Sequence, residues 1–392
     1  MLKKKLDFVI LAGGKGRRIK KYLKGSPKPM LKFNKKSFLD YIITKACTYN
    51  FENIYILTGY KSNIIFKKYN KKIFNFIKIT CLKENKEMGT GGALFKLKKK
   101  LNDFILVNGD TIFNLNYNEL INALDKNKLG VMSLVKNKYQ YSSKLKNLTL
   151  KNRLILYNKK STLMNAGVYF FRKKILSSIQ NKKISLENDI MPNYIKKNKI
   201  NGKVFKKFFI DIGSKKYLKI ASKELLKNFE KPAVFLDRDG VINYDYGYVH
   251  NIKNFKFRPG VIKGLQYLTK KNYYIFIITN QAGIGKKIFT LNQFNKLHLK
   301  LKEYFIKKNI LINDVKFSAY HKKAKIKKYK KNSNFRKPGN LMIQEVFKRW
   351  DINLSKSFMI GDKKSDYLSA KKSNLKFYYA SNNFYKQIKG LT

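Results

Sequence analysis

Short apolar runs that stop abruptly at glycine or at a polar residue recur along the chain. Each run has the length and composition of a short buried strand. These runs are residues 7–11, 104–107, 234–236, 274–278 and 358–360. Residues 215–228 and 341–350 instead carry the apolar spacing of amphipathic helices. Strands that alternate with helices in this way predict an α/β protein with doubly wound, Rossmann-like sheets.

The length of 392 residues is enough for two such domains, each with its own core. No linker rich in Gly, Ser or Pro separates the halves. The predicted helix over 215–228 leads directly to Pro232 and the next strand. We therefore place the domains at residues 1–229 and 230–392, with a short junction between them.

Composition adds an extreme positive charge to this picture. The chain has 87 Lys+Arg against 23 Asp+Glu, a net charge of +64, and 44% hydrophobic residues. Lysines drive binding to nucleic acids, so a basic nucleic-acid-binding protein is one alternative. However, the lysines run from Lys3 to Lys389 without a basic tail or stripe. We interpret the charge as compositional drift that also concentrates phosphorylated substrates, and we expect no specific nucleic-acid partner.

The cysteine count and the start of the chain indicate a cellular location. Cys47 and Cys81 are the only cysteines, so no disulfide framework is predicted and a reducing cytoplasm fits. The apolar stretch 8–12 ends at Gly13, too short for a signal peptide or a membrane span. We expect a cytoplasmic protein without a membrane partner.

The first strand runs into a glycine-rich turn with cationic residues, Ala12–Arg18, which contains Gly13, Gly14 and Gly16. Such a turn lets backbone N–H groups approach phosphates, although it lacks the spacing of a dinucleotide fingerprint or a P-loop. Lys28 then stands between Pro27 and Pro29, a rigid mount for a cation. By themselves these residues are equally compatible with a solvated loop.

Seven segments in a fixed order resemble the sugar-1-phosphate nucleotidyltransferases. They are 12–18, 27–30, 87–93, 108–110, 165–169, 185–189 and 209–213. The resemblance implies that Asp110 and Asp211 bind Mg²⁺, that Arg18 neutralises the departing pyrophosphate, and that Lys28 neutralises the attacking sugar phosphate. It further implies nucleotide or sugar contacts from the remaining matched residues: Gly13, Gly14, Gly16, Gly89, Thr90, Gly91, Lys159, Asn165, Gly167 and Glu187.

Within that family the segments 89–93 and 165–167 most resemble the heptose-1-phosphate guanylyltransferases, with the mannose- and glucose-1-phosphate enzymes as near relatives. Two positions depart from the family pattern. Arg17 replaces a small hydroxyl residue, and Asn158 replaces a Glu that contacts a sugar hydroxyl. The reaction type is therefore better supported than the choice of sugar.

The second half opens with two carboxylates at the end of an apolar strand, Asp237 and Asp239. Strand side chains alternate, so both point the same way at the edge where α/β sheets bind ligands. A nucleophile with its own acid and a cation site would use this arrangement, whereas a simple turn would also contain Asp and Gly. Later strand ends favour chemistry: polar residues close the strands at Thr279–Gln281 and Gly361–Asp366, and Arg336-Lys337-Pro338 precedes a helix.

These segments resemble the haloacid-dehalogenase-type phosphatases. The resemblance implies that Asp237 forms an aspartyl-phosphate and that Asp239 is the acid and base. Thr279 and Lys337 would bind the phosphoryl group. Asp362 would hold Mg²⁺ together with Asp237 and the backbone carbonyl of Asp239.

The closer resemblance is to heptose-1,7-bisphosphate 7-phosphatases, with histidinol-phosphate phosphatases as cousins. It adds substrate contacts, which we expect from Asp245, Tyr248, Asn280, Arg336 and Lys363.

Relatives often carry a Cys/His zinc loop before the Arg-Lys-Pro motif. The matching positions here are Ser318, Tyr320, Ser333 and Phe335, and His321 is a lone neighbour. None of these residues forms a good zinc set, so we predict no zinc. The loop Ala319–Phe335 is then either held by other packing or mobile.

Together the two halves predict one sequential hypothesis. The phosphatase would convert heptose 1,7-bisphosphate to heptose 1-phosphate, and the transferase would activate that product with a nucleoside triphosphate, expected to be GTP. Mg²⁺ would serve both domains, and a homo-oligomer is possible. The alternative is a mannose- or glucose-1-phosphate nucleotidyltransferase fused to a sugar-phosphate or histidinol-phosphate-type phosphatase.

Overall fold

A computed structural model describes residues 5–137 and 145–392. The chain divides into two compact units, residues 1–46 with 51–225, and residues 47–50 with 226–392. The division falls four residues before the boundary that we placed after residue 229. Among the described residues, no helix combines the length and the apolar character needed to cross a membrane.

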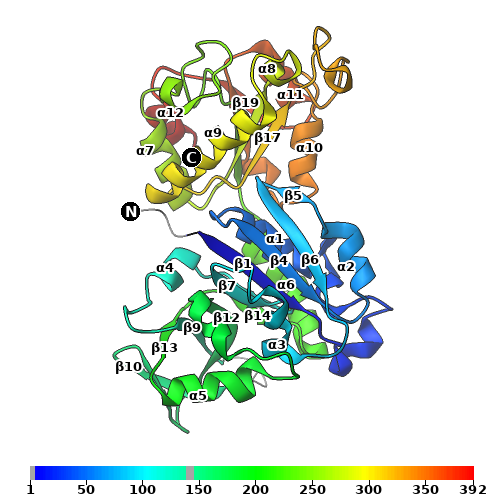
Figure 1. Cartoon of the computed structure of the whole chain (residues 1–392). Helices are drawn as coiled ribbons and strands as arrows, with labels where there is room; N and C mark the ends of the chain where they lie inside the picture. The colour runs from blue at the N-terminus through cyan, green and yellow to red at the C-terminus, as the bar shows by residue number, and fades with distance from the viewer. Residues whose placement is uncertain (1–4, 138–144) are drawn as a thin grey trace. The chain divides into compact units, whose positions relative to one another are not determined.

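The first unit is built on one large mixed sheet (Figure 1). Its described strands follow the order β10-β11-β13-β9-β12-β7-β1-β4-β6-β5. Their bounds are β1 Leu6–Ala12, β4 Asn53–Thr58, β5 Ile73–Phe74, β6 Ile77–Lys83, β7 Asp103–Asn108, β9 Gly130–Lys136, β10 Lys146–Lys151, β11 Leu154–Tyr157, β12 Leu163–Phe171 and β13 Ile200–Val204. Two small pairs accompany the sheet, β2 (Lys32–Phe33) with β3 (Lys36–Ser37), and β8 (Thr111–Phe113) with β14 (Phe209–Asp211).

Strands β7, β1, β4 and β6 run parallel at the centre of this sheet, while β12 pairs antiparallel with β7. Leu11 of β1 lies opposite Asn108 of β7. The carboxyl ends of the two strands therefore meet, and the Gly109 N–H donates to the Leu11 carbonyl at 2.8 Å. This register brings the glycine-rich turn beside Asp110.

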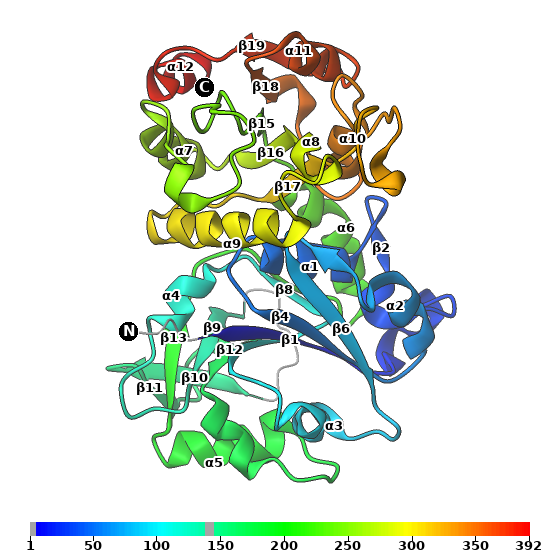
Figure 2. The same ribbon diagram turned by 45° about the horizontal axis from the view of Figure 1, so that its top comes forward.

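Helices and single turns cover both faces of the sheet (Figure 2). Val9, Phe104 and Leu106 share one buried cluster with Leu94 and Leu97. On the other face Phe8 packs against Phe51 and Tyr117. The helical elements of the first unit are η1 Arg17–Tyr22, η2 Lys28–Met30, α1 Phe38–Cys47, α2 Ser62–Tyr69, α3 Gly89–Gly92, η3 Ala93–Leu97, α4 Tyr117–Ile121, η4 Lys173–Ser178, η5 Leu186–Ile190 and α5 Met191–Lys196, followed by α6 Lys215–Phe229 at the division between the units.

The second unit contains a wholly parallel sheet in the order β17-β16-β15-β18-β19. The strands are β15 Ala233–Leu236, β16 Tyr274–Asn280, β17 Asp314–Ser318, β18 Phe358–Gly361 and β19 Lys376–Tyr379. The helices are η6 Ile252–Asn254, α7 Val261–Lys270, α8 Ala282–Gly285, α9 Leu291–Lys307, η7 Lys327–Tyr329, α10 Leu341–Phe347, η8 Leu354–Lys356, α11 Lys364–Lys371 and α12 Phe384–Leu391.

Side chains of β15 alternate between two cores. Val234 and Leu236 join a cluster with residues of α7, α9 and α12, whereas Ala233 and Phe235 join a second cluster with residues of α10 and α11. Burial on both faces explains why this strand is a continuous apolar run. The predicted α/β fold class is confirmed.

Most of the helices and strands predicted from the sequence are present in the structure, although their ends differ from the predicted ones. The runs 7–11, 104–107 and 274–278 lie inside β1, β7 and β16. The helix predicted over 341–350 ends at Phe347 instead, and Trp350 packs against Tyr274 and Phe276.

Phe235 is fully buried, and its truncation tests the cluster that it forms with residues of α10 and α11. Phe235→Ala should lower the free energy of unfolding of this unit by about 3–5 kcal/mol, because it leaves a cavity in a packed core. Trp350 is the only tryptophan and belongs to the same cluster, so its fluorescence reports urea unfolding of this unit. Tyr379→Ala, at a side chain that is 57% exposed, is the control and should change stability by about 0.5 kcal/mol or less. Equal losses in both variants would contradict this assignment of the core.

Candidate functional sites

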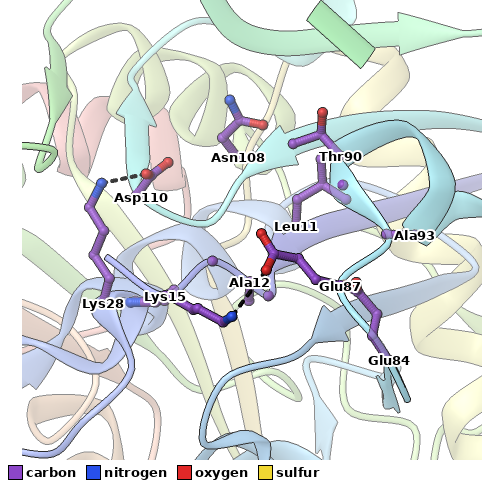
Figure 3. A pocket seen from close by; sticks show the side chains of 14 residues that line it. Leu11, Ala12, Lys15, Lys28, Glu84, Glu87, Thr90, Ala93, Asn108 and Asp110 are labelled. Atoms are coloured by element: carbon purple, nitrogen blue, oxygen red, sulfur yellow. Dashed lines mark hydrogen bonds and ion pairs between the residues drawn. The ribbon is translucent and has the colours of Figure 1, made fainter. Parts of the chain in front are cut away.

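The glycine-rich turn lines a pocket of the first unit together with residues that follow β6 and β7 (Figure 3). Gly13, Gly14, Lys15, Lys28, Glu84, Glu87, Gly89, Thr90, Asn108 and Asp110 are among its lining residues. Backbone near Gly13 and Gly14 is accessible here, and Lys15 and Lys28 provide positive charge. The pocket therefore suits a phosphate-bearing ligand.

Lys28 supplies a buried cation to this pocket. Its side chain is buried, and its Nζ lies 2.5 Å from Oδ2 of Asp110, a contact visible in Figure 3. Burial by itself would raise the pKa of Asp110. The Lys28 ammonium, with a contribution from Arg18, outweighs burial and holds that pKa below its ordinary value.

Asp211 approaches the same place from the small β8–β14 pair, in register with Thr111. Its carboxylate accepts from the Gly213 N–H at 2.7 Å and from the Thr111 hydroxyl at 3.2 Å. Burial first, and the negative charge of Asp110 second, raise the pKa of Asp211 to about 6. Two neighbouring carboxylates with opposed pKa shifts fit a divalent cation, which would relieve their repulsion.

A second pocket continues from these carboxylates toward β12. Its lining includes Arg18, Thr90, Asn165, Gly167, Glu187 and Asp211. The Thr90 hydroxyl donates to Glu187 at 2.6 Å and accepts from the Leu186 N–H at 2.8 Å. The Asn165 Oδ1 accepts from the Gly167 N–H at 3.0 Å, where Gly167 has a φ of +67°. Thr90 and Asn165 thus fix the walls of this pocket.

Three expected contact residues lie outside the linings of these two pockets. Gly16, with a φ of +60°, begins η1 and packs beside Lys28, so it shapes the turn. Gly91 is buried and donates its N–H to the Ile184 carbonyl. Lys159 is exposed in the turn after β11. The preceding Asn158 accepts from the Lys160 N–H at 3.0 Å and so supports this turn.

Sequence reasoning gave no individual role to two carboxylates of the first pocket, Glu84 and Glu87, although Glu87 opens the matched segment 87–93. Glu87 pairs with Lys15 at 3.0 Å, and Glu84 accepts from the Met88 N–H at 3.3 Å. Burial raises the pKa of Glu84. Their place in a chain with only 23 acidic residues, just before a glycine-rich segment, was the available signal.

The second site lies at the carboxyl edge of the β15–β18 sheet. Lys337 is almost fully buried there, and its Nζ is 2.8 Å from Asp237 and 2.5 Å from Asp366. It also donates to the Ile278 carbonyl at 2.9 Å. Burial would lower the pKa of Lys337, but the two carboxylates raise it, so Lys337 stays a cation.

Asp237 follows β15, and its N–H donates to the Ile360 carbonyl of β18 at 3.0 Å. Burial raises its pKa to about 7; Lys337 opposes that rise and Asp366 adds to it. Asp237, Asp362 and Asp366 can each offer one oxygen within 4.8 Å of the others. Oδ1 of Asp362 is buried without a hydrogen-bond partner, so the donor set fits a hard divalent cation.

Gly240 makes room for this cluster. Its φ is +87°, and a Cβ at this position would lie 2.2 Å from Oδ2 of Asp362. The glycine after the two carboxylates is therefore required for the approach of the third. Asp366, at the end of the polar segment Gly361–Asp366, lies within the same cluster, although the resemblance gave it no metal-binding role.

Asp239 is held by three side chains. Arg238 contacts both of its oxygens at 2.9 Å, and the amides of Asn243 and Gln281 each donate to it at 2.9 Å. The Gln281 amide also donates to the Thr279 hydroxyl at 2.8 Å. The expected acid–base residue and the expected phosphoryl-binding threonine are thus linked.

The other residues expected to contact the substrate have different partners in the structure. Asn280 exchanges hydrogen bonds with the backbone of Lys337, both at 3.0 Å, so it positions that lysine. Lys363 pairs with Asp245 at 2.9 Å. The Tyr248 hydroxyl accepts from Lys286 at 2.9 Å, and a buried nitrogen of Arg336, Nη1, has no hydrogen-bond partner.

The loop Ala319–Phe335 is held by packing. The N–H groups of Lys325 and Ile326 donate to the Gly285 carbonyl at 2.8 and 3.0 Å. The rings of Tyr320 and Tyr329 meet edge to face at 5.7 Å. Of the two alternatives left open by the sequence, other packing describes this loop.

Two family models match the chain, one in each half. Residues 8–144 match the nucleotidyl transferase family, and residues 237–388 match the family described as polynucleotide kinase 3 phosphatase. The chain therefore joins a nucleotidyltransferase and a phosphatase, and it is an enzyme of both classes.

Curated relatives define the phosphatase half more closely. The D-glycero-beta-D-manno-heptose-1,7-bisphosphate 7-phosphatase of Rhodopseudomonas palustris is 36% identical over 145 residues, 37% of this chain and 81% of that protein. The protein of the same name from Photorhabdus laumondii is 39% identical over 139 residues, 36% of this chain and 74% of its own. The chain belongs to the family of these heptose-bisphosphate phosphatases.

Solved structures include one similar to the transferase half. HddC from Yersinia pseudotuberculosis is 28% identical, with 56% of this chain and 99% of that chain covered and a TM-score of 0.47.

The raised pKa of Asp211 predicts a pH-dependent stability in the absence of metal. The folded protein keeps this proton up to about pH 6, whereas the unfolded chain loses it near pH 4, so stability should fall as pH rises between these values. Between pH 4 and pH 7.5 the free energy of unfolding of Asp211→Asn should fall by roughly 2–3 kcal/mol less than that of the wild type. Calorimetry in the presence of a chelator measures both. At pH 7.5 Mg²⁺ should stabilise the wild type more than the variant.

Asp125→Asn is the matched control, because Asp125 forms an exposed pair with Arg153 in the same unit. Its pH dependence should follow that of the wild type. An unchanged pH dependence in Asp211→Asn would contradict the raised pKa of Asp211.

Proposed function

We propose that the chain catalyses two consecutive steps of nucleotide-heptose synthesis. The phosphatase removes the 7-phosphate of D-glycero-D-manno-heptose 1,7-bisphosphate, and the nucleotidyltransferase couples the resulting heptose 1-phosphate to a nucleotide, with GTP as the donor. The observation that carries this proposal is that one chain combines membership of the heptose-bisphosphate phosphatase family with a nucleotidyl transferase pocket. The intermediate keeps the 1-phosphate that the second reaction needs.

In the transferase site the 1-phosphate attacks the α-phosphorus of the triphosphate and pyrophosphate leaves. This chemistry depends on positioning and charge neutralisation. Lys28 holds the attacking phosphate, and Arg18 neutralises the departing pyrophosphate. Asp110 and Asp211 hold Mg²⁺, which supplies positive charge against the reacting phosphates. The 2.5 Å contact between Lys28 and Asp110 supports the proposal that both residues act on the same phosphate groups.

The nucleotide contacts come from the glycine-rich turn and from α3, with Thr90, Glu187 and Asn165 as the walls on the sugar side. Thr90 lines both pockets, which supports a continuous path from the nucleotide to the sugar. Lys159 is exposed after β11 and lies outside the linings of both pockets.

In the phosphatase site Asp237 attacks the 7-phosphorus while Asp239 donates a proton to the leaving oxygen. Asp239 then takes a proton from the water that releases phosphate from Asp237. Lys337 and Thr279 bind the transferring group. Asp237, Asp362 and the Asp239 carbonyl would hold Mg²⁺, which would supply positive charge beside the transferring phosphoryl group. The buried position of Lys337 against Asp237 supports this assignment.

A coupled assay tests the proposal. The full chain is incubated with Mg²⁺, one nucleoside triphosphate, and either anomer of the heptose bisphosphate, since the relatives' name specifies the β form whereas the guanylyltransferase resemblance implies α. Phosphate and pyrophosphate are measured separately. We expect phosphate from the bisphosphate with any triphosphate present, and pyrophosphate only with GTP.

Two variants should each remove one of the two activities and keep the other. Asp237→Asn should abolish phosphate release, a loss of at least about 10³-fold, and still give pyrophosphate from supplied heptose 1-phosphate. Lys28→Ala should do the reverse. If heptose phosphates are inert while mannose 1-phosphate or glucose 1-phosphate yields pyrophosphate, the heptose assignment is wrong.

A further inference from the structure

Arg238 is the residue between the two carboxylates of the phosphatase site, and it is the largest fully buried side chain among the described residues. A buried guanidinium costs several kcal/mol unless its N–H groups are satisfied. A purely structural position between two catalytic residues would be filled at lower cost by an apolar side chain. The contacts of Arg238 therefore call for an explanation.

Most of these contacts converge on Asp239. Nε of Arg238 lies 3.1 Å from Oδ1, and Nη2 lies 2.9 Å from both Oδ1 and Oδ2. The planar fork of arginine fixes the plane of a carboxylate as well as its distance, which a lysine does not do. Asn243 and Gln281 each add one amide donor.

Three further residues contact the guanidinium of Arg238 and hold it in place. Nη2 donates to the Val249 carbonyl at 2.6 Å, and Nη1 lies 3.4 Å from Nε2 of His298. The ring of Phe294 covers the guanidinium at 5.9 Å and also packs against His298 at 4.3 Å. Burial, with the charge of Arg238 as the second cause, holds the pKa of His298 well below its ordinary value, so His298 is neutral. A neutral ring can accept from Nη1.

The backbone ties the same residue to the nucleophile, because the Arg238 N–H donates to Oδ1 of Asp237 at 2.7 Å. Arg238 thus contacts Asp237 through its backbone and Asp239 through its side chain. We propose that Arg238, braced by His298, is a positioning residue that sets the orientation of the Asp239 carboxyl relative to Asp237 for both proton transfers. This inference rests on the roles proposed above for Asp237 and Asp239.

The chemistry gives this role a specific signature. In the first step the bond from phosphorus to the leaving oxygen breaks as the bond to Asp237 forms, and Asp239 passes its proton to the leaving oxygen. In the second step water attacks phosphorus, Asp239 takes the water proton, and the bond to Asp237 breaks. A nitrophenolate leaving group needs no proton, whereas a sugar alkoxide does. Misplacement of Asp239 should therefore slow the first step only for the sugar.

The test compares Arg238→Met and Arg238→Lys in the full chain with Mg²⁺, using the heptose bisphosphate and p-nitrophenyl phosphate. For Arg238→Met we expect kcat on the sugar substrate to fall about 10- to 100-fold with KM changed by less than about 3-fold. With p-nitrophenyl phosphate we expect a burst of nitrophenolate, because formation of the aspartyl-phosphate is retained and its hydrolysis is slowed. Arg238→Lys should recover little, since it lacks the fork.

His298→Phe is a second variant for the case in which Arg238→Met does not fold. It keeps the ring against Phe294 and removes the acceptor of Nη1, so it should show the same leaving-group dependence at smaller magnitude. Arg349→Met is the control. Arg349 pairs with Asp314 at 3.1 Å, at the first residue of β17 and hence at the sheet edge opposite the site, and this variant should keep the wild-type ratio of the two activities.

Equal losses on both substrates without a burst, or wild-type kcat in Arg238→Met and His298→Phe, would overturn the positioning role. These outcomes are distinct from a failure of the proposed function. If Asp237→Asn still releases phosphate from both substrates, the nucleophile has been assigned wrongly. If only the heptose bisphosphate is inert, the burst with p-nitrophenyl phosphate still tests Arg238.

Discussion

The buried ammonium of Lys337 is the interaction on which the phosphatase site depends. It lies between Asp237 and Asp366, 2.8 and 2.5 Å from their oxygens, with almost no access to water. Removal of one partner from such a group leaves an uncompensated buried charge, which costs roughly 3–5 kcal/mol. The parallel sheet provides the necessary geometry, since the carboxyl ends of β15 and β18 bring these acidic residues to one edge. Fold and site are therefore stabilised by the same contact.

The transferase site uses the same arrangement on an unrelated strand order. Lys28 is buried against Asp110, as Lys337 is against Asp237, and each lysine is followed by proline. Each site also contains a carboxyl outside the lysine pair, Asp211 or Asp362, whose pKa is raised chiefly by burial. A lysine can neutralise one carboxylate, and the excess negative charge that remains is what a divalent cation would balance.

The parts of this structure that sequence predicted are the local ones. Apolar runs located β1, β7, β15, β16 and β18, because burial on both faces leaves a continuous apolar signature. The partners behind the sites were not predictable. His298, for example, lies 60 residues from Arg238, so only the folded chain brings this pair together. The helix expected to reach residue 350 stops at Phe347. Beyond it Trp350 packs on Tyr274 and Phe276, while its N–H still donates to the Val346 carbonyl at 2.9 Å.

The net charge of +64 acquires a structural meaning at these sites. Basic residues far outnumber carboxylates in this chain, so a surface lysine could pair with a site carboxylate and compete with a metal. Asp110 and Asp237 avoid this competition because each is already paired with a buried lysine that precedes proline. Exposed pairs, such as Lys15 with Glu87, are worth only about 0–1 kcal/mol. Lys28 and Lys337 are buried against these carboxylates and so differ from the exposed lysines on the surface.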